Sequence, residues 1–386
     1  MLSTALRLAA AVLAAAGLPG AQVPAVVVHQ DQVARARAEQ VLEGLSLPQR
    51  VGQLFMVGTP AVGSTATVAQ QVRRYHVGNV MLTGRSHAGL RATARITGGL
   101  RARTSDAATG DVGMLVATDQ EGGQVQVLQG PGFSGIPSAL WQGEHWAPSR
   151  LRTAARTWAR QLAGAGVDVD LAPVADTVPG PGAAGTNPPI GASGREFGFT
   201  PRVVGNHARA FARGMADGGV LATVKHFPGL GRVSANTDTS SGVTDSTTRR
   251  HGPFLAPFRR AVEAGVPLVM MSTAYYPRMD AHHPAAFSRY VIGEVLRGDL
   301  GFRGVVVSDD LGIARQVASW PPGRRAVEFV RAGGDLVLTV APDTLPAMYH
   351  AVLHRARHHA AFRRTVDRAA LRVLHLKAGQ GLLGDR

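Results

Sequence analysis

Short apolar runs rich in β-branched residues recur along the chain from Val51 onward, and longer segments separate them. Within a run, polar residues rarely alternate with apolar ones. This pattern is typical of strands that are covered on both faces, as in a parallel sheet. Eight runs fit the description, at residues 51–58, 77–84, 113–120, 167–176, 220–229, 266–273, 304–310 and 335–340.

The intervening segments carry apolar residues at helical spacing, with alanine and arginine between them, and we expect them to be helices. They cover residues 66–75, 90–104, 148–165, 201–217, 252–264, 288–299, 324–332 and 343–360. Strands that alternate with helices indicate an α/β protein, and eight such units favour a (β/α)8 TIM barrel over an open sheet. We therefore predict one barrel domain over residues 26–386, with a lead-in helix within 26–50 and a terminal helix within 361–386.

The N-terminus contains an apolar stretch at residues 5–18 that only Arg7 interrupts, and small residues and prolines follow it. The stretch is shorter than the ~20 residues that cross a membrane. We interpret residues 1–25 as a signal peptide, which predicts a secreted protein of the bacterial cell envelope. A buried N-terminal helix, or a start codon placed too early, is the alternative.

The composition excludes several kinds of site and binding partner. The chain has no cysteine, which excludes disulfides, thiolate metal sites and a cysteine nucleophile. The net charge is +15, but no basic run is interleaved with aromatic residues, so we expect no nucleic-acid partner. This charge favours association with an anionic cell wall, the alternative being an effect on solubility alone.

His350, His354 and His358 share a helical spacing and are interpreted as a solvated stripe rather than a metal site. We expect a monomer.

Polar clusters stand where several predicted strands end. They are Asp119-Gln120-Glu121, Asp176, Lys225-His226 and Ser308-Asp309-Asp310. Each acidic residue taken alone could be a helix cap. In a barrel, however, the carboxyl ends of the strands converge on the face where active sites lie, so the clusters together predict one site.

The segment 229–245 follows the fifth predicted strand and is rich in glycine, serine and threonine. This composition predicts a mobile surface loop. Asp238 lies near its centre. A loop of this kind can close over a substrate and deliver a proton donor, although a plain solvated turn is the alternative.

From SLPQRVGQLFMVG to about residue 340, the chain resembles the single-domain bacterial family-3 glycoside hydrolases, whose best-known members are β-N-acetylglucosaminidases (β-hexosaminidases). The matching motifs are SLPQRVGQLFMVG (46–58), DQEGG (119–123), VDLAPVAD (169–176), GREFG (194–198), KHFPG (225–229), PAAFS (284–288) and LRGDLGFRGVVVSDDLG (296–312).

The resemblance implies a (β/α)8 barrel and retaining hydrolysis of a terminal β-linked sugar, with a carbohydrate as the substrate. It implies that Asp309 is the nucleophile and that Asp310 has a structural role, capping the next helix. By the same matching, the sugar hydroxyls are contacted by Asp119, Arg195, Lys225 and His226. No metal or organic cofactor is implied, because two carboxyl groups suffice for the reaction.

Two departures from the family pattern bear on activity. Val127 stands where the family has a substrate-contacting arginine after its DQEGG motif. In the loop after KHFPG, Leu230 replaces a histidine, and the family's D-S-H triplet, which holds its Asp-His acid/base pair, becomes Asp238-Thr239-Ser240. Serine does not titrate near neutral pH and cannot replace the histidine.

These departures leave three accounts of the general acid. Asp238 could donate the proton directly if its pKa is raised, Glu121 or another loop acid could serve, or proton donation could be lost. We favour Asp238. The leading function is an exported exo-glycosidase that removes terminal N-acetylglucosamine from cell-wall or chitin-type oligosaccharides. The alternatives are β-glucosidase specificity, phosphate rather than water as the acceptor, a sugar-binding homologue without turnover, and an envelope interaction protein.

Overall fold

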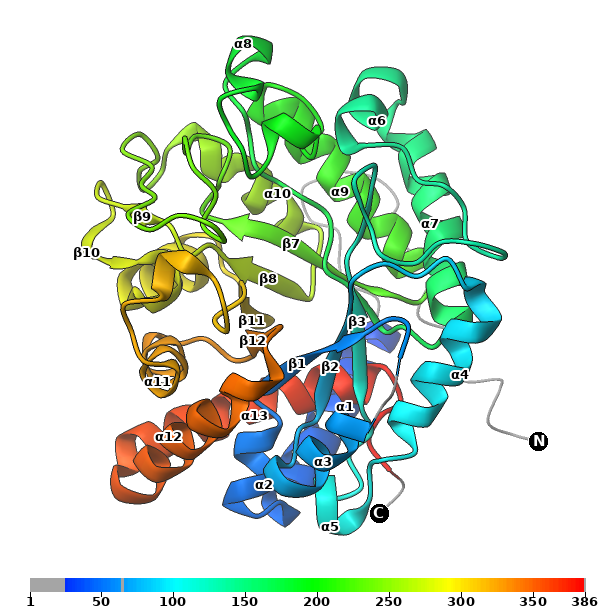
Figure 1. The fold of residues 1–386 in the computed structure, drawn as a ribbon, viewed down its shortest axis with the longest axis vertical. Coiled ribbons are helices and arrows are strands. Elements are labelled where there is room, and N and C mark those ends of the chain that lie inside the picture. Colours follow the sequence, from blue (N-terminus) through cyan, green and yellow to red (C-terminus); the bar gives the residue numbers. More distant parts are fainter. Residues whose placement is uncertain (1–24, 64–65, 385–386) are drawn as a thin grey trace.

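The computed structural model describes residues 25–63 and 66–384, and the predicted signal peptide therefore lies outside the described residues except for Ala25. Figure 1 looks into the mouth of a barrel whose strands are surrounded by helices. None of the helices in the described ranges is long and apolar enough to cross a membrane.

Eight parallel strands form the barrel, which confirms the predicted (β/α)8 fold. Their spatial order is β11-β8-β7-β6-β3-β2-β1-β12, and a bridge between Val307 and Leu336 brings the two ends of this order together. The strands are β1 (Phe55–Pro60), β2 (Asn79–Thr83), β3 (Leu115–Thr118), β6 (Val169–Asp170), β7 (Leu221–Phe227), β8 (Leu268–Met271), β11 (Val305–Ser308) and β12 (Val337–Thr339).

The barrel helices fall close to the predicted segments because their apolar faces pack on the outside of the strands. They are α3 (Ala66–Tyr75), α4 (Gly89–Arg101), α7 (Pro148–Gly164), α9 (Pro201–Asp217), α10 (Ala256–Glu263), the π-helix η5 (Tyr290–Asp299), α11 (Pro322–Ala332) and α12 (Leu345–His358). Outside the ring lie α1 (Ala25–Gly44), α2 (Leu47–Gly52) and α13 (Ala360–Gly379), in agreement with the lead-in and terminal helices that the sequence predicts.

Shorter elements decorate the loops. Two antiparallel hairpins form at the mouth, β4 (Gln120–Gly122) with β5 (Val125–Gln126), and β9 (Tyr275–Tyr276) with β10 (Asp280–Pro284). The short helices are α5 (Asp106–Thr109), α6 (Ala139–His145), α8 (Pro181–Ala184), η2 (Gly191–Ser193), η3 (Pro253–Leu255), η4 (Ala285–Phe287), η6 (Arg315–Val317) and η7 (Pro342–Thr344).

The first strand starts later than its apolar run suggests, at Phe55 rather than Val51. The residues before it belong to α2, because Ser46 caps that helix. Its side chain accepts from the Gln49 amide, and the Gln49 side chain accepts from the Ser46 amide. Such a capping box satisfies the free amides of a helix start, and here it extends the helix into the apolar run.

The core divides into two layers. Buried side chains from alternate positions of the strands fill the barrel interior, among them Met56, Leu115, Leu171, Met270 and Leu338. A larger cluster lies between the strands and the helices. Interior packing supports the strand ends from below, so that polar side chains at the mouth stand on a rigid base.

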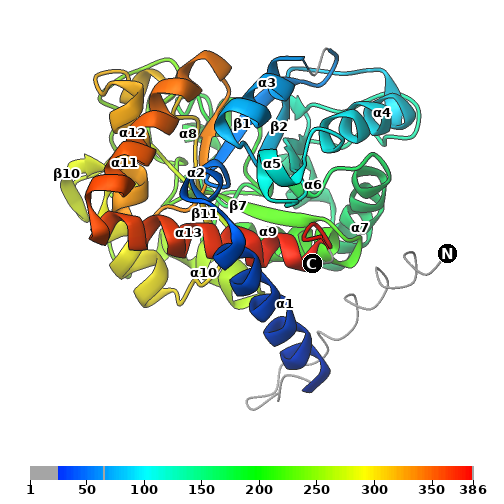
Figure 2. The ribbon, with the colours of Figure 1, turned by 90° about the horizontal axis from the view of Figure 1, so that it is seen from below.

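Lys377 closes the floor of the barrel. Helix α13 carries Lys377 and crosses below the barrel (Figure 2). The fully buried ammonium of Lys377 donates to Gln53 Oε1 at 2.7 Å, Gly78 O at 2.8 Å and Gly113 O at 2.9 Å. These acceptors precede β1, β2 and β3. Burial lowers the pKa of Lys377 to about 7. Three acceptors match the three donors of an ammonium, however, so we assign the charged form at neutral pH.

Replacing Lys377 with methionine should lower the free energy of unfolding by about 2–4 kcal/mol, because three buried acceptors lose their donor. Urea denaturation would measure the loss as a lower midpoint. Arg363→Met, on the exposed face of the same helix, is the matched control and should change stability by less than about 0.5 kcal/mol. Equal midpoints for Lys377→Met and the unmodified protein would show that the floor contacts contribute nothing.

Candidate active site

A pocket of about 320 Å³ opens at the carboxyl ends of the strands. This volume is at the lower end of the range for small-molecule sites. The structure brings together there the six side chains that the sequence predicts to act on or bind the substrate, although they come from five different loops and strand ends. These are Asp119, Arg195, Lys225, His226, Asp238 and Asp309.

Lys225 organises one wall of the pocket. Its ammonium is almost fully buried at the end of β7 and donates to Asp119 Oδ1 at 2.7 Å, and it lies 2.6 Å from Glu121 Oε1. Arg195 grips the same glutamate with two hydrogen bonds, Nε to Oε2 at 2.9 Å and Nη2 to Oε1 at 2.7 Å. The two cations and two carboxylates therefore fix one another, and Asp119 keeps partial exposure toward the pocket.

Glu121 is ionised and serves as an anchor. Burial opposes its ionisation, but the charges of Arg195 and Lys225 outweigh burial and hold the pKa of Glu121 well below its usual range. Glu121 does not line the pocket. This argues against Glu121 as the general acid, one of the alternatives that the sequence left open, because a donor must carry a proton at the working pH.

Asp176 orients His226. The carboxylate is fully buried at the end of the fourth barrel unit, with Oδ2 2.7 Å from His226 Nδ1. Its other oxygen accepts from the backbone amides of His226, at 3.2 Å, and Leu230, at 2.8 Å. A carboxylate on Nδ1 fixes the tautomer and turns Nε2 away from Asp176. The position of Asp176 at a strand end was the only sequence signal for this role.

Asp309 stands directly after β11 and is half-buried in the pocket, while Asp310 also borders the pocket but is buried. The carboxylate of Asp310 accepts from the amides of Gly312, Ile313, Ala314 and Val340 at 2.8–3.2 Å. The expected structural role of Asp310 is present in another form. It organises the turn at 312–314 and ties it to the end of β12, whereas α11 begins later, at Pro322.

Hydrogen bonds join the segment 229–245, for which the composition predicts a mobile surface loop, to distant parts of the chain. Asn187 Nδ2 donates to the carbonyls of Leu230 and Val233 at 2.8 and 2.7 Å. In the middle, the amides of Arg315 and Gln316 donate to the carbonyls of Asp238 and Thr237, both at 3.0 Å. Composition does not encode these contacts with distant segments.

Asp238 lines the pocket, and the pKa of its carboxyl group is raised to about 6 by lost hydration and then by the negative charge of Asp309. The residue as a whole is exposed, so we give the charge of Asp309 more weight than burial. Two neighbouring carboxyl groups with different affinities for protons are the usual basis for one nucleophile and one acid.

The family model described as glycosyl hydrolase family 3 N terminal domain matches residues 46–376. The chain belongs to glycosyl hydrolase family 3. Among the relatives, a β-hexosaminidase of Stenotrophomonas maltophilia (strain K279a) is 31% identical over 339 residues, covering 86% of this chain and 95% of the relative.

Solved structures of family 3 members have the same fold. A β-N-acetylhexosaminidase from Beutenbergia cavernae superposes with a TM-score of 0.85 at 50% identity, covering 86% of this chain and 98% of the other. A family 3 β-N-acetylglucosaminidase from Paenibacillus gives a TM-score of 0.81 at 31% identity, covering 89% of this chain and 64% of the other. The chain thus matches nearly the whole length of the first of these enzymes.

The departures from the family-3 pattern lie in and around the pocket of this glycoside hydrolase. Leu230 lines the pocket and is buried, so an apolar side chain occupies that part of the wall. Val127 is also buried and lies outside the pocket lining. Ser240 is not a lining residue either, and His251 lies on the surface near Asp299, with its side chain 66% exposed. Neither residue replaces the missing acid/base histidine.

Proposed function

We propose that this family 3 glycoside hydrolase is a retaining β-N-acetylhexosaminidase that removes a terminal β-linked N-acetylglucosamine. The proposal rests chiefly on one observation, the convergence of Asp309 and Asp238 on a pocket of single-sugar size whose wall is built from fixed polar groups. The names of its relatives support the choice of sugar.

In this proposal, Asp309 attacks the anomeric carbon while Asp238 protonates the departing oxygen, which breaks the glycosidic bond and leaves a covalent glycosyl-enzyme. Asp238, now ionised, then takes a proton from water. The water attacks the anomeric carbon and releases the sugar with its original configuration, and Asp309 is regenerated as a carboxylate.

The remaining pocket residues hold the sugar. Asp119, Arg195 and Lys225 present fixed donors and acceptors that are already charge-paired, so the sugar hydroxyls complete hydrogen bonds without breaking the cluster. His226 adds Nε2, which Asp176 turns away from itself. This rigidity positions the anomeric carbon before the reaction begins.

β-Glucosidase specificity is a second candidate. Val127 stands where the family has an arginine, and Leu230 stands where it has a histidine, so the guanidinium and the imidazole of the family pattern are absent. The test is turnover of 4-nitrophenyl N-acetyl-β-glucosaminide against 4-nitrophenyl β-glucoside by the purified protein. A higher kcat/KM for the N-acetylated sugar supports the proposal, and a preference for the glucoside overturns it. Binding without turnover of either would favour the sugar-binding homologue.

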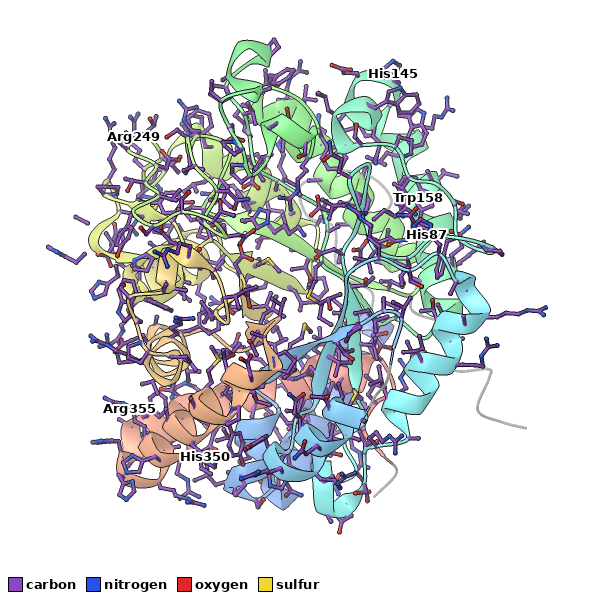
Figure 3. The ribbon with its side chains drawn as sticks, viewed as in Figure 1. His87, His145, Trp158, Arg249, His350 and Arg355 are labelled. Atoms are coloured by element: carbon purple, nitrogen blue, oxygen red, sulfur yellow. The ribbon has the colours of Figure 1, made fainter. Side chains whose placement is uncertain are left out.

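We also propose that the protein is exported and associates with the cell wall. The predicted signal peptide supports export. The support for association is a basic surface at the corner between α12 and α13. Both helices lie in the outer part of the molecule in Figure 1, and Figure 3 labels His350 and Arg355 on α12. Residues 350–376 contain a single acid, Asp367, and Arg50 contacts it. The exposed members of this α12–α13 basic surface are Arg357, His358, His359, Arg363, Arg364 and Arg368.

A phosphate-bearing wall polymer fits this surface by charge, and binding there leaves the mouth free. Arg363→Ala/Arg364→Ala should weaken pelleting with purified bacterial cell walls more than Arg156→Ala/Arg160→Ala on α7, which removes the same charge elsewhere. Both variants should retain activity. Equal pelleting by the two variants would indicate general attraction by net charge, and walls stripped of phosphate polymer test the partner directly.

A further inference from the structure

We infer that Gln316 is a positioning residue for Asp238 and that this enzyme holds its general acid in place before substrate binds. The inference rests on the proposed role of Asp238. It starts from the hydrogen bonds that one buried glutamine makes to both sides of the segment 237–243, which carries the acid.

Gln316 lies in the short helix η6 and is 3% exposed. Its backbone amide donates to the carbonyl of Thr237, and the preceding amide, of Arg315, donates to the carbonyl of Asp238 itself, both at 3.0 Å. Thr237 is also buried. The acid is therefore attached to η6 through its own peptide unit and through the peptide unit before it.

The side chain of Gln316 holds the other end of the segment. Oε1 accepts from the Val243 amide at 2.9 Å, and Nε2 donates to the Val243 carbonyl at 3.1 Å. An amide side chain that pairs with both groups of one residue imitates a strand partner. Val243 is buried as well, so loss of these two hydrogen bonds would leave its backbone amide and carbonyl without a partner in the protein interior.

The segment is also closed on itself. The side-chain oxygen of Asn236 accepts from the Asp238 amide at 2.9 Å, and the backbone carbonyl of Asn236 accepts from the amides of Thr239 and Ser240 at 3.2 and 2.9 Å. A turn of this kind has little freedom of its own. Because Gln316 holds the ends and Asn236 the interior, the carboxyl group of Asp238 has a defined place beside the pocket.

The helix η6 is in turn connected to the nucleophile. Asp309 is followed by Asp310, whose carboxylate gathers the amides of residues 312–314 directly before η6. Arg325 supports this turn from the other side through the carbonyls of Leu311 and Gly312, at 2.8 and 2.6 Å. Both carboxyl groups of the proposed reaction are thus carried by one hydrogen-bonded unit, which fixes the acid relative to the nucleophile.

The test compares two substrates that differ in their need for an acid, a β-linked N-acetylglucosamine disaccharide and the 4-nitrophenyl glycoside. Gln316→Met keeps the length of the side chain and removes both bonds to Val243. Displacement of the acid should lower kcat/KM for the disaccharide by about 10–100-fold, while the activated substrate loses less than about threefold.

A pH profile distinguishes displacement of Asp238 from a general loss of structure caused by the substitution. If the acid moves away from Asp309, its pKa falls toward the ordinary value of an aspartate, so the alkaline decline of disaccharide turnover should shift to lower pH. Hydrogen exchange of the amides in 236–243 should also become faster. Should Gln316→Met not fold, Gln316→Glu retains the acceptor for the Val243 amide and should show smaller changes in the same direction.

Gln142→Met is the matched control, because Gln142 is a fully buried glutamine of α6 that donates to Pro137 O at 2.6 Å and lies outside the pocket lining. It should affect both substrates equally. If Asp238→Asn discriminates between the substrates but Gln316→Met does not, the positioning role is wrong and the proposed function stands. If Asp238→Asn does not discriminate either, the assignment of the acid is wrong, and the role of Gln316 falls with it.

Discussion

Asp309→Asn should abolish turnover of every substrate, with a loss of kcat of roughly 10⁴-fold or more, because the amide cannot form the covalent glycosyl-enzyme. The loss should be equally severe for the 4-nitrophenyl glycoside, whose departure needs little protonation. Asparagine keeps the shape of the side chain, including an oxygen that can accept from the Asp310 amide, as Asp309 Oδ1 does at 2.9 Å. The fold should therefore survive.

Steady-state kinetics with the 4-nitrophenyl substrate would measure this effect, and binding of N-acetylglucosamine by calorimetry would show that the pocket remains intact. Asp343→Asn serves as the matched control, since Asp343 is an exposed aspartate in the loop after β12. Retention of more than about a hundredth of the activity by Asp309→Asn would exclude Asp309 as the nucleophile, because a residual of that size exceeds what removal of a nucleophile allows.

Asp238→Asn should lower activity on the two substrates to different extents. Turnover of the disaccharide should fall by about 10²–10⁴-fold, the usual contribution of a general acid, whereas the activated 4-nitrophenyl glycoside should lose much less in the glycosylation step. Ser240→Ala is the control, because Ser240 stands where the family has its acid/base histidine and lies outside the pocket lining. It should leave both activities unchanged. Equal losses of kcat/KM on both substrates in Asp238→Asn would contradict the role of Asp238, because kcat/KM for this two-step reaction reports the glycosylation step.

The pH dependence follows from the same carboxyl group. A general acid must be protonated, and lost hydration together with the negative charge of Asp309 raises the pKa of Asp238 to about 6. Disaccharide turnover should therefore be high below pH 6 and decline as the pH rises through that value. The alkaline decline should be absent in Asp238→Asn. A decline only above pH 8 in the unmodified enzyme would point to another donor.

The fold was predictable because it depends on local and repetitive signals. Buried parallel strands need continuous apolar runs, and covering helices need an apolar stripe, so alternation along the chain already specifies a barrel. The helix Pro201–Asp217 illustrates this, since its predicted and observed bounds agree. The boundary at Phe55 was missed because a capping box at Ser46 competes with the apolar run, and periodicity alone does not weigh the two.

For the candidate site, the sequence predicted only which residues lie at strand ends that face the same side of the barrel. Knowledge that barrel strand ends converge was sufficient to place Asp119, Lys225 and Asp309 around one pocket. The behaviour of Glu121 was not predictable, because its ionisation depends on the charges of Arg195 and Lys225 at hydrogen-bond distance. The same applies to Asp176, whose predicted strand-end position placed it near the site without specifying that it would hold the imidazole of His226.

The amino-acid sequence was sufficient to predict the barrel, the face on which the site lies, the family, and Asp309 as the carboxylate proposed to attack. These follow from periodicity and from motifs in which neighbouring residues act together. Only the tertiary structure decided how the acid is presented. The composition of 229–245 favours mobility, and it is contacts from Asn187 and Gln316, distant in the chain, that hold the loop and place Asp238 close enough to Asp309 for one charge to alter the other.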